Sequence, residues 1–333
     1  MKNKLLLLLT IFGMITIVVT ACCKEDCEET PTPICGSDLS INWDSLSYSP
    51  TPHELQIPAT LPQSMPIPSS NPLTEEGIAL GRLLFFDPLL SQDQSMSCAS
   101  CHNAAFGFTD NGKQFSEGVT GEIGHRNAMP LMNLGWASRL FWDGRSNSLE
   151  DQALGPVPNP VELHVSWSEV ACRLMDSESY RIKFYEAFGT TEIDSNFVAK
   201  AIAQFERTMI SGASRFDLII TPGSGVFPTE AEDLGYQLFY NESGDCFHCH
   251  GDPGRLFTDN LFHNNGLTET DNFAGFTDKG LGMVTGNPED NGLFKTPSLR
   301  NINLTAPYMH DGRFATLEEV IDHYSQNIKT SPN

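Results

Sequence analysis

The chain has 333 residues, which is enough for two domains with their own hydrophobic cores. It carries 20 basic and 42 acidic residues, a net charge of −22. A surface of this charge repels polyanions, which argues against nucleic acid and anionic lipid surfaces as partners, whereas a basic patch on a small redox protein would be attracted. A solubilising surface with no specific partner is an equal alternative.

The first 21 residues are typical of a bacterial lipoprotein signal peptide. A basic start at residues 1–4 precedes an almost wholly apolar run over residues 5–19, and small residues follow before Cys22. This pattern predicts lipid attachment at Cys22, and hence an extracytoplasmic protein of the periplasm or cell envelope that is anchored to the membrane by lipid alone. An uncleaved transmembrane helix is the alternative, although the apolar run is short for a bilayer.

Residues 22–72 are predicted to form an extended tether. The segment is rich in Pro, Ser and Thr, which leaves it few ways to build a packed core. Cys23, Cys27 and Cys35 lie near its start, in a compartment where disulfides are allowed. Cys172, inside an expected helix, is interpreted as a small buried hydrophobic residue.

The rest of the chain looks like two diverged copies of one unit. Thr74 is expected to cap a helix that leads to Cys-Ala-Ser-Cys-His at residues 98–102, and a similar apolar segment leads to Cys-Phe-His-Cys-His at residues 246–250. Each motif is followed by Phe-Thr-Asp and, further on, by Asp-Gly-Arg. Residues 194–209 have helical periodicity, and no segment shows the sustained alternation of a strand. We therefore predict an all-α protein with long loops.

Both cysteine motifs are typical of covalent haem c attachment. Two cysteines on one helical turn can each form a thioether to a haem vinyl group, and the next histidine is then the proximal ligand of the iron. Zinc is the alternative, but zinc-binding pairs lie roughly 15–20 residues apart and lack the trailing histidine. We predict two haem c groups in two cytochrome c-like domains, residues 73–225 and 226–333, attached through Cys98, Cys101 and His102 and through Cys246, Cys249 and His250.

The repeat makes the two haem sites unequal. Tyr324 lies 13 residues beyond the Asp of the second Asp-Gly-Arg, and Pro156 lies 13 residues beyond the Asp of the first. If these positions are equivalent, Tyr324 offers a phenol oxygen to the second haem, and Pro156 leaves the first haem an open face for peroxide. An ordinary half-buried tyrosine is an equal alternative, and His323 is the best alternative ligand.

From about residue 73 onward the chain resembles the bacterial dihaem cytochrome c peroxidases and the MauG-type dihaem enzymes. The resemblance rests on the two haem motifs and on residues 126–130, 141–145, 155–162, 296–301 and 304–312. It implies that the N-terminal haem is the peroxide site and that the C-terminal haem relays electrons. Hydrogen peroxide would then be reduced to water with electrons from an external donor such as a small cytochrome c.

The resemblance also assigns roles to single residues. Glu162 matches the catalytic carboxylate, which would take a proton from one peroxide oxygen and deliver it to the other. Gln152 lines the same distal pocket as Glu162, and Trp142 matches the electron relay between the haems. The competing interpretations are a solvated surface acid for Glu162 and core packing for Trp142.

A calcium site between the domains is a further implication of the resemblance. The Asn127 side chain and the backbone carbonyls of Thr305 and Pro307 match its ligands, and such oxygen donors suit a hard cation.

The chain departs from the typical peroxidases at two positions. Tyr324 stands where they carry Met, while MauG-type enzymes carry Tyr, and a hard phenolate favours ferric iron and lowers the reduction potential. His125 is the nearest match to a loop histidine that blocks the first haem, but it lies unusually close to Asn127. We therefore predict a first haem that is open without reductive activation.

Two other functions are compatible with the motifs. A MauG-type oxidase would use the same chemistry on a protein or organic substrate, and Tyr324 favours it. A non-catalytic dihaem electron carrier would have both irons six-coordinate, and Pro156 and Glu162 disfavour it. The sequence leaves the donor and the oligomeric state open, a homodimer included.

Overall fold

The structure is a computed structural model that describes residues 35, 41–251 and 255–333. The signal peptide expected at residues 1–21 and the lipidation expected at Cys22 lie outside these residues, as do Cys23 and Cys27. Within the described ranges, no helix is both long and apolar enough to cross a membrane.

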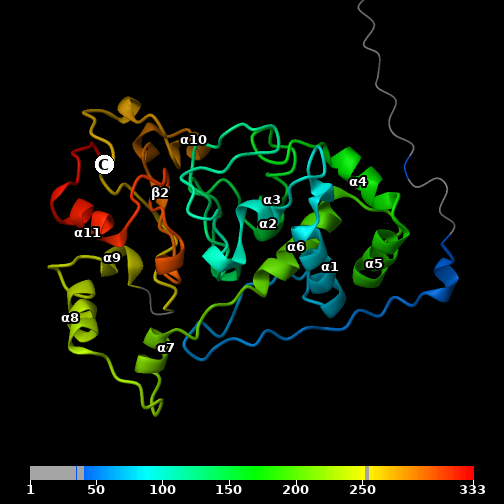
Figure 1. Ribbon diagram of the computed structural model, residues 1–333, viewed down its shortest axis with the longest axis horizontal. Coiled ribbons are helices and arrows are strands. Elements are labelled where there is room, and N and C mark those ends of the chain that lie inside the picture. The colour runs from blue at the N-terminus through cyan, green and yellow to red at the C-terminus, as the bar shows by residue number, and fades with distance from the viewer. Residues whose placement is uncertain (1–34, 36–40, 252–254) are drawn as a thin grey trace, which may run out of the picture. The chain divides into compact units, whose positions relative to one another are not determined.

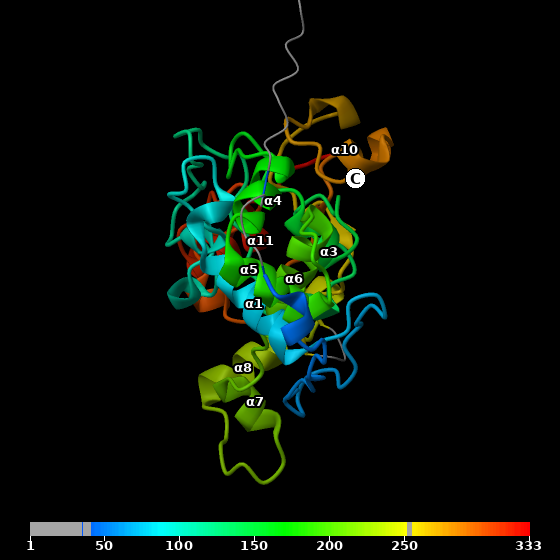
Figure 2. The ribbon, with the colours of Figure 1, turned by 90° about the vertical axis from the view of Figure 1, so that its right-hand side faces the viewer.

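Helices carry the first half of the chain. They are α1 (Glu75–Phe86), α2 (Cys98–Cys101), α3 (Leu149–Ala153), α4 (Trp167–Met175), α5 (Glu178–Phe188) and α6 (Ser195–Arg207). The helix expected over residues 194–209 is α6, which packs against α1 and α3 (Figures 1 and 2). The side chain of Thr74 accepts a hydrogen bond from the Gly77 N–H, so the expected N-cap of α1 is confirmed.

The second half has shorter helices and one small sheet. Its elements are α7 (Arg215–Ile220), α8 (Glu230–Phe239), α9 (Phe247–His250), α10 (Gly282–Thr285), α11 (Leu317–Gln326) and an antiparallel pair of strands, β1 (Phe262–His263) and β2 (Phe294–Lys295). Short 3-10 helices lie at Trp43–Ser45, Pro88–Leu90, Ala104–Phe106, Leu134–Trp136, Phe273–Gly275, Pro288–Asp290 and Ile302–Leu304. The described chain is thus mainly helical with long loops, as predicted, and the strand pair was not anticipated.

The internal repeat extends to the backbone. Left-handed residues recur at matching positions of the two copies, with φ of 59° and 56° at Phe108 and Phe257, 63° and 61° at Asn133 and Asn301, and 64° and 76° at Phe141 and Met309. A sequence repeat that preserves such rarely populated dihedral angles is a repeat of structure.

The two copies differ in the helix that follows Asp-Gly-Arg. α3 ends at Ala153, so Pro156 lies in the loop beyond it. α11, which begins at the matching position, continues to Gln326 and therefore carries Tyr324 on its last turn. This difference agrees with the sequence, because proline cannot continue a helix interior.

Backbone hydrogen bonds join the two halves in a symmetric way. The Asn127 N–H donates to the His310 carbonyl at 2.8 Å, and the Lys295 N–H donates to the Trp142 carbonyl at 2.8 Å. In the repeat, Lys295 is the counterpart of Asn127 and His310 is the counterpart of Trp142. Contacts group the chain from Cys35 to Asn333 into one unit, so its division into two haem domains at residue 225 stays a prediction.

Ion pairs of two arginines reinforce this junction. The Arg126 guanidinium donates to Asp143 at 2.6 Å and, through two nitrogens, to Asp278 at 2.7 Å. Arg300 forms a bidentate pair with Asp217 on α7, with both distances 2.9 Å. Paired, bidentate guanidinium groups of this kind impose geometry as well as attraction.

The proline-rich segment is not a free tether over residues 41–72. It is extended, as predicted, but Leu61 and Met65 are buried against the helical body, along which the segment runs in Figure 1. Gly135 supplies the space for Met65, because a Cβ at Gly135 would lie 2.3 Å from the Met65 sulfur. Proline disfavours helices and sheets, yet it leaves apolar side chains able to pack on a neighbouring surface.

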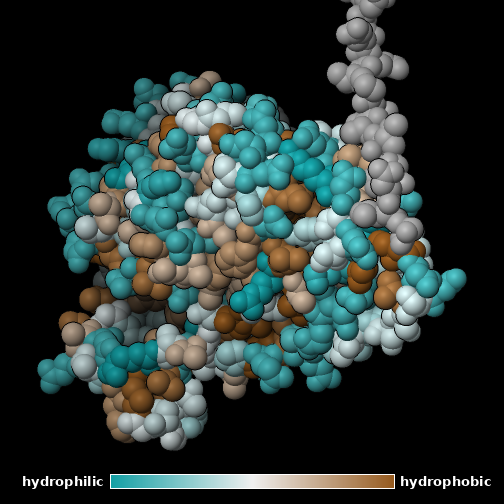
Figure 3. Space-filling view, turned by 45° about the vertical axis from the view of Figure 1, so that its right-hand side comes forward, coloured by the Kyte–Doolittle hydropathy of each residue, from teal (hydrophilic) through white to brown (hydrophobic). Residues whose placement is uncertain are grey.

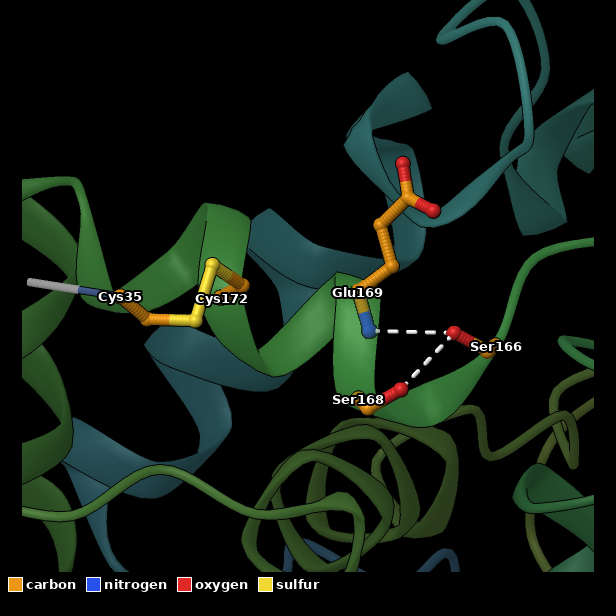
Figure 4. Close-up of a disulfide and its surroundings, with 5 residues drawn as sticks. All are labelled: Cys35, Ser166, Ser168, Glu169 and Cys172. Carbon is orange, nitrogen blue, oxygen red and sulfur yellow. Dashed lines mark hydrogen bonds between the residues drawn. A yellow bond between two sulfur atoms is a disulfide. The ribbon is translucent and has the colours of Figure 1, made fainter. Parts of the chain in front are cut away.

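The interpretation of Cys172 as a simple buried hydrophobic residue was wrong. Cys172, on α4, forms a disulfide with Cys35, 137 residues earlier in the chain (Figure 4). The pairing depends on how the extended segment returns to α4, which no local pattern reveals.

Candidate functional site

The first cysteine motif is presented by α2. Cys98 and Cys101 are both free and partly buried, and burial raises the pKa of the Cys98 thiol to about 12 and that of Cys101 to about 11. The His102 Nδ1 donates to the Phe108 carbonyl at 2.8 Å. Because a carbonyl can only accept, this bond fixes the tautomer and leaves Nε2 with a lone pair for a metal.

The second motif repeats this arrangement. Cys246 and Cys249 are free, and the His250 Nδ1 donates to the Phe257 carbonyl at 2.9 Å. Burial lowers the pKa of His250, as it does that of His102, so both imidazoles are held in the neutral form that ligates iron.

These residues fit a haem c group at each motif. Free, neutral thiols on one helical turn can form thioethers, and each histidine has its second nitrogen anchored as proximal ligands do. A disulfide would require the two cysteines of a motif to be paired with each other, and the described residues show no such pair. One cluster of potential metal ligands does include a motif cysteine, since Cys249 lies with Asp259 and His263, but it contains no second cysteine as a zinc-binding Cys pair would.

Glu162 lies in the loop beyond α3 and faces the first motif. Its carboxylate accepts a hydrogen bond from the Asn159 amide at 2.7 Å, and its charge raises the pKa values of Cys98 and Cys101. Burial raises the pKa of Glu162 itself, which Asn159 and Arg145 only partly oppose. A half-buried acid with a raised pKa is compatible with a proton-transfer group, and the catalytic role of Glu162 stays a prediction.

Gln152, Pro156 and Trp142 complete this part of the structure. Gln152 lies on α3 and Pro156 in the following loop, and both are half-buried. Trp142 is 9 % exposed, and its indole N–H donates to the Asn127 carbonyl at 2.9 Å. Because its own carbonyl accepts from Lys295, Trp142 is bonded to both halves, and its role as an electron relay stays a prediction.

Tyr324 lies near the second motif. Although the Tyr324 residue is 44 % exposed, desolvation of its phenol and the nearby Cys249 and Cys246 raise the phenol pKa, so the hydroxyl group lies within electrostatic reach of both cysteines. The amide of Asn265 donates to the Tyr324 oxygen at 3.4 Å. The same amide approaches the Met309 sulfur at 3.2 Å, which places a second potential iron ligand close to Tyr324.

The alternative ligand His323 is engaged elsewhere. It is buried, its Nε2 donates to the Asn265 carbonyl at 2.8 Å, and its ring lies 5.4 Å from that of Phe314. These contacts make His323 a packing residue of α11. His125 is exposed and stays only a prediction as a ligand of the first haem.

Asn127 has the orientation that a cation site requires. Its amide nitrogen donates to the carbonyls of Lys113 and Gln114, both at 3.1 Å, which turns the amide oxygen away from them. The bond from its backbone to His310 brings it beside the segment that contains Thr305 and Pro307. Calcium at these oxygens stays a prediction.

Glu206 and Lys295 are among the buried ionisable residues that the sequence analysis missed. Glu206 is buried on α6, four residues after Ile202 and eight after Val198, so its place on the apolar face of that helix was a usable signal. Lys295 is buried on β2, and only its position as the counterpart of Asn127 in the repeat pointed to it.

Comparison with known proteins gives consistent relationships. A family model described as di-haem cytochrome c peroxidase matches residues 75–223. The methylamine utilization protein MauG of Methylorubrum extorquens is 39 % identical over 282 residues, which cover 82 % of this chain and 75 % of that protein. The cytochrome c551 peroxidase of Nitrosomonas europaea is 38 % identical over 267 residues, which cover 77 % of this chain and 75 % of that protein.

One solved structure is similar to this chain over most of the length of both. The crystal structure of a MauG-like protein associated with microbial copper homeostasis superposes with a TM-score of 0.73 at 36 % identity, covering 88 % of this chain and 85 % of that one.

Proposed function

Since the chain belongs to the family of di-haem cytochrome c peroxidases and MauG proteins, with two haem c cofactors, we propose that it reduces hydrogen peroxide to water with electrons from an external donor such as a small cytochrome c. The observation that supports this proposal most directly is Glu162, a half-buried acid with a raised pKa within electrostatic reach of the first haem motif. The reaction consumes one peroxide, two electrons and two protons and gives two waters.

In this proposal the side chains near the first motif handle the protons. The haem at His102 would supply the iron at which peroxide reacts. This iron would receive the electrons that cleave the O–O bond from the second haem. Glu162 would take a proton from one peroxide oxygen and deliver it to the other, while Asn159 holds the carboxylate in place. Gln152 and Pro156 line the pocket, and Pro156 has no side-chain atom that could ligate the iron.

The second motif would store and relay electrons. Tyr324 would cap the haem at His250, and Trp142 would carry electrons between the halves to which it is bonded. Calcium at Asn127, Thr305 and Pro307 would stiffen the junction. The protein would work outside the cytoplasm, attached to the membrane through a lipid on Cys22.

A MauG-type oxidase that acts on a protein or organic substrate is the second candidate. Tyr324 favours it, because a phenol beside the second motif replaces the thioether of typical peroxidases. A non-catalytic dihaem electron carrier is the third candidate, and a ferric spectrum without any high-spin component would establish it.

The proposal is tested by peroxide consumption with a reduced small cytochrome. Glu162→Gln keeps the size of the side chain and removes its basicity, so we expect turnover to fall about 100-fold or more. Glu122→Gln, at an exposed acid, is the matched control and should turn over normally. Equal turnover in all three proteins would remove Glu162 from the mechanism, and no turnover in any of them would favour the oxidase or the electron carrier.

The pH profile gives an independent measurement on the same proteins. A base must be ionised to accept a proton, and burial raises the pKa of Glu162. Wild-type activity should therefore decline with falling pH at a higher pH than an ordinary glutamate would impose. The residual activity of Glu162→Gln should lack this acidic limb.

A further inference from the structure

Lys295 is a buried cation without an adequate partner in the described structure. Its residue is 4 % exposed, and its ammonium makes one long contact, 3.5 Å to the carbonyl of the adjacent Thr296. Burial lowers the pKa of Lys295 to about 8, so the charged form is disfavoured in these surroundings. A buried ammonium group is expensive unless an anion compensates it, which indicates that an anionic partner belongs here.

The nearest acid does not fill this role. Asp259 is the one carboxylate whose charge favours the ammonium form of Lys295. Its own oxygens are already used, since one accepts from the Leu261 N–H at 2.9 Å and the other from His263 at 2.7 Å. Asp259 is thus held in a separate pairing and leaves Lys295 uncompensated.

Lys295 lies beside the segment that holds the second haem motif. β2 pairs with β1, and the Thr258 hydroxyl donates to the Thr296 carbonyl at 2.7 Å. That segment also contains Phe257, whose carbonyl orients His250. Lys295 also lines a small cavity between the two halves, together with Met129 and Asn133 of the first half.

The repeat gives Lys295 a special place. It is the counterpart of Asn127, and each of the two donates its backbone N–H to an aromatic residue of the opposite half. Lys295 thereby holds the carbonyl of Trp142, while Asn127 holds that of His310. At this junction the first half therefore contributes the neutral amide side chain of Asn127, and the second half contributes the lysine side chain of Lys295.

We propose that Lys295 provides the internal positive charge for the haem at His250 by pairing with one of its propionate carboxylates beside Trp142. The propionates are the anions that a haem brings to its site, and they supply the compensation that the described side chains lack. A positive charge next to this haem favours its ferrous form, so it raises the reduction potential against the lowering effect of Tyr324. Lys295 would thus affect electron transfer indirectly, through the reduction potential of the haem at His250.

The test measures the midpoint potentials of both haems in purified dihaem protein, with the two resolved by their EPR signals. Lys295→Met removes the charge and keeps a flexible side chain, so the reduction equilibrium of the haem at His250 should shift at least tenfold towards the ferric form, or about 59 mV downward. The haem at His102 should change less. Lys279→Met, at an exposed lysine of the same half, is the matched control and should leave both potentials unchanged, because solvent screens its charge.

Lys295→Arg separates charge from packing. It keeps the positive charge and should retain a potential close to that of the wild type. An Arg variant that shifts as far as the Met variant would show that packing is responsible and would overturn the proposal, as would unchanged potentials in Lys295→Met. If the Met variant does not fold, Lys295→Gln replaces it, with the same expectation.

The inference depends on the two haem groups and not on peroxide as the substrate. Potentials are measured without turnover, so a protein inactive with peroxide can still support the role of Lys295. Conversely, an active peroxidase with no shift in Lys295→Met would reject this role alone.

Discussion

At the scale of single residues, Glu206 shows what burial does to a carboxyl group. It is 4 % exposed on α6, and its Oε2 has no hydrogen-bond partner among the described residues. Burial raises its pKa to about 8, although Arg207 opposes the shift. Arg207 cannot neutralise it fully, because its guanidinium is paired with Glu150 at 2.8 Å. Glu206 is therefore largely neutral at pH 7.

The raised pKa of Glu206 predicts a pH-dependent stability difference. The folded protein holds this proton up to about pH 8, whereas the unfolded chain releases it near the ordinary glutamate pKa of 4.5. The stabilising contribution is fully present below pH 4.5 and is lost as the pH rises towards 8. Glu206→Gln has no proton to lose, so its stability relative to the wild type should rise across this window, by about 3 kcal/mol at pH 7.

Thermal unfolding of both proteins between pH 5 and 8 checks this prediction. Glu186→Gln, at an exposed acid of α5, should track the wild type at every pH. A stability difference for Glu206→Gln that does not change with pH would show that Glu206 titrates normally.

At the scale of elements, α1 and α8 are related helices in unlike surroundings. α6 crosses α1 at Gly81, where an added Cβ would lie 1.8 Å from the Ala201 carbonyl oxygen. α8 has the matching glycine, Gly235, and no described atom lies within 4 Å of a Cβ built there. α7 and α8 form a lobe with apolar side chains on its surface, seen at the lower edge of Figure 3. The same helix pattern is thus used with a crossing partner in one half and without one in the other.

The two glycines give a matched pair of substitutions. Gly81→Ala should destabilise the protein by about 3 kcal/mol, because the methyl group would displace the backbone of α6. Gly235→Ala should instead stabilise α8 by up to about 1 kcal/mol, because alanine is the better helix former. Chemical denaturation of both variants measures the contrast. A comparable loss at Gly235 would contradict the open surroundings of α8 and indicate that another helix crosses it.

At the scale of the whole molecule, the disulfide ties the extended segment to the helical body. Cys35 and Cys172 close a long stretch of chain, which restricts the unfolded ensemble. Replacing both by Ser should lower the free energy of unfolding by about 3 kcal/mol. Reductant should produce a similar loss in the wild type and none in the double variant. A wild-type protein indifferent to reductant would show that this disulfide does not contribute to stability.

Much of the candidate site could be predicted from the sequence, because its chemistry is local. In the first motif, Cys98 and Cys101 lie on one helical turn and His102 follows directly, so this spacing alone indicates haem attachment. The positions of Glu162 and Tyr324 followed from family resemblance and from the repeat. The structure gives Glu162 half-buried surroundings and places the Tyr324 phenol within electrostatic reach of the second motif, while the roles of both residues stay predictions.

By itself, the sequence determined the mainly helical class, the repeat, the two haem motifs and the family, since each of these is expressed in spacings along one stretch of chain. Only the tertiary structure decided the partner of Cys172, the docking of residues 41–72 and the burial of Glu206 and Lys295. The physical reason is that pairing and desolvation depend on segments brought together from distant parts of the chain. The sequence does not show whether water or protein surrounds a lysine, but the free-energy cost of its charged form is much higher when protein surrounds it.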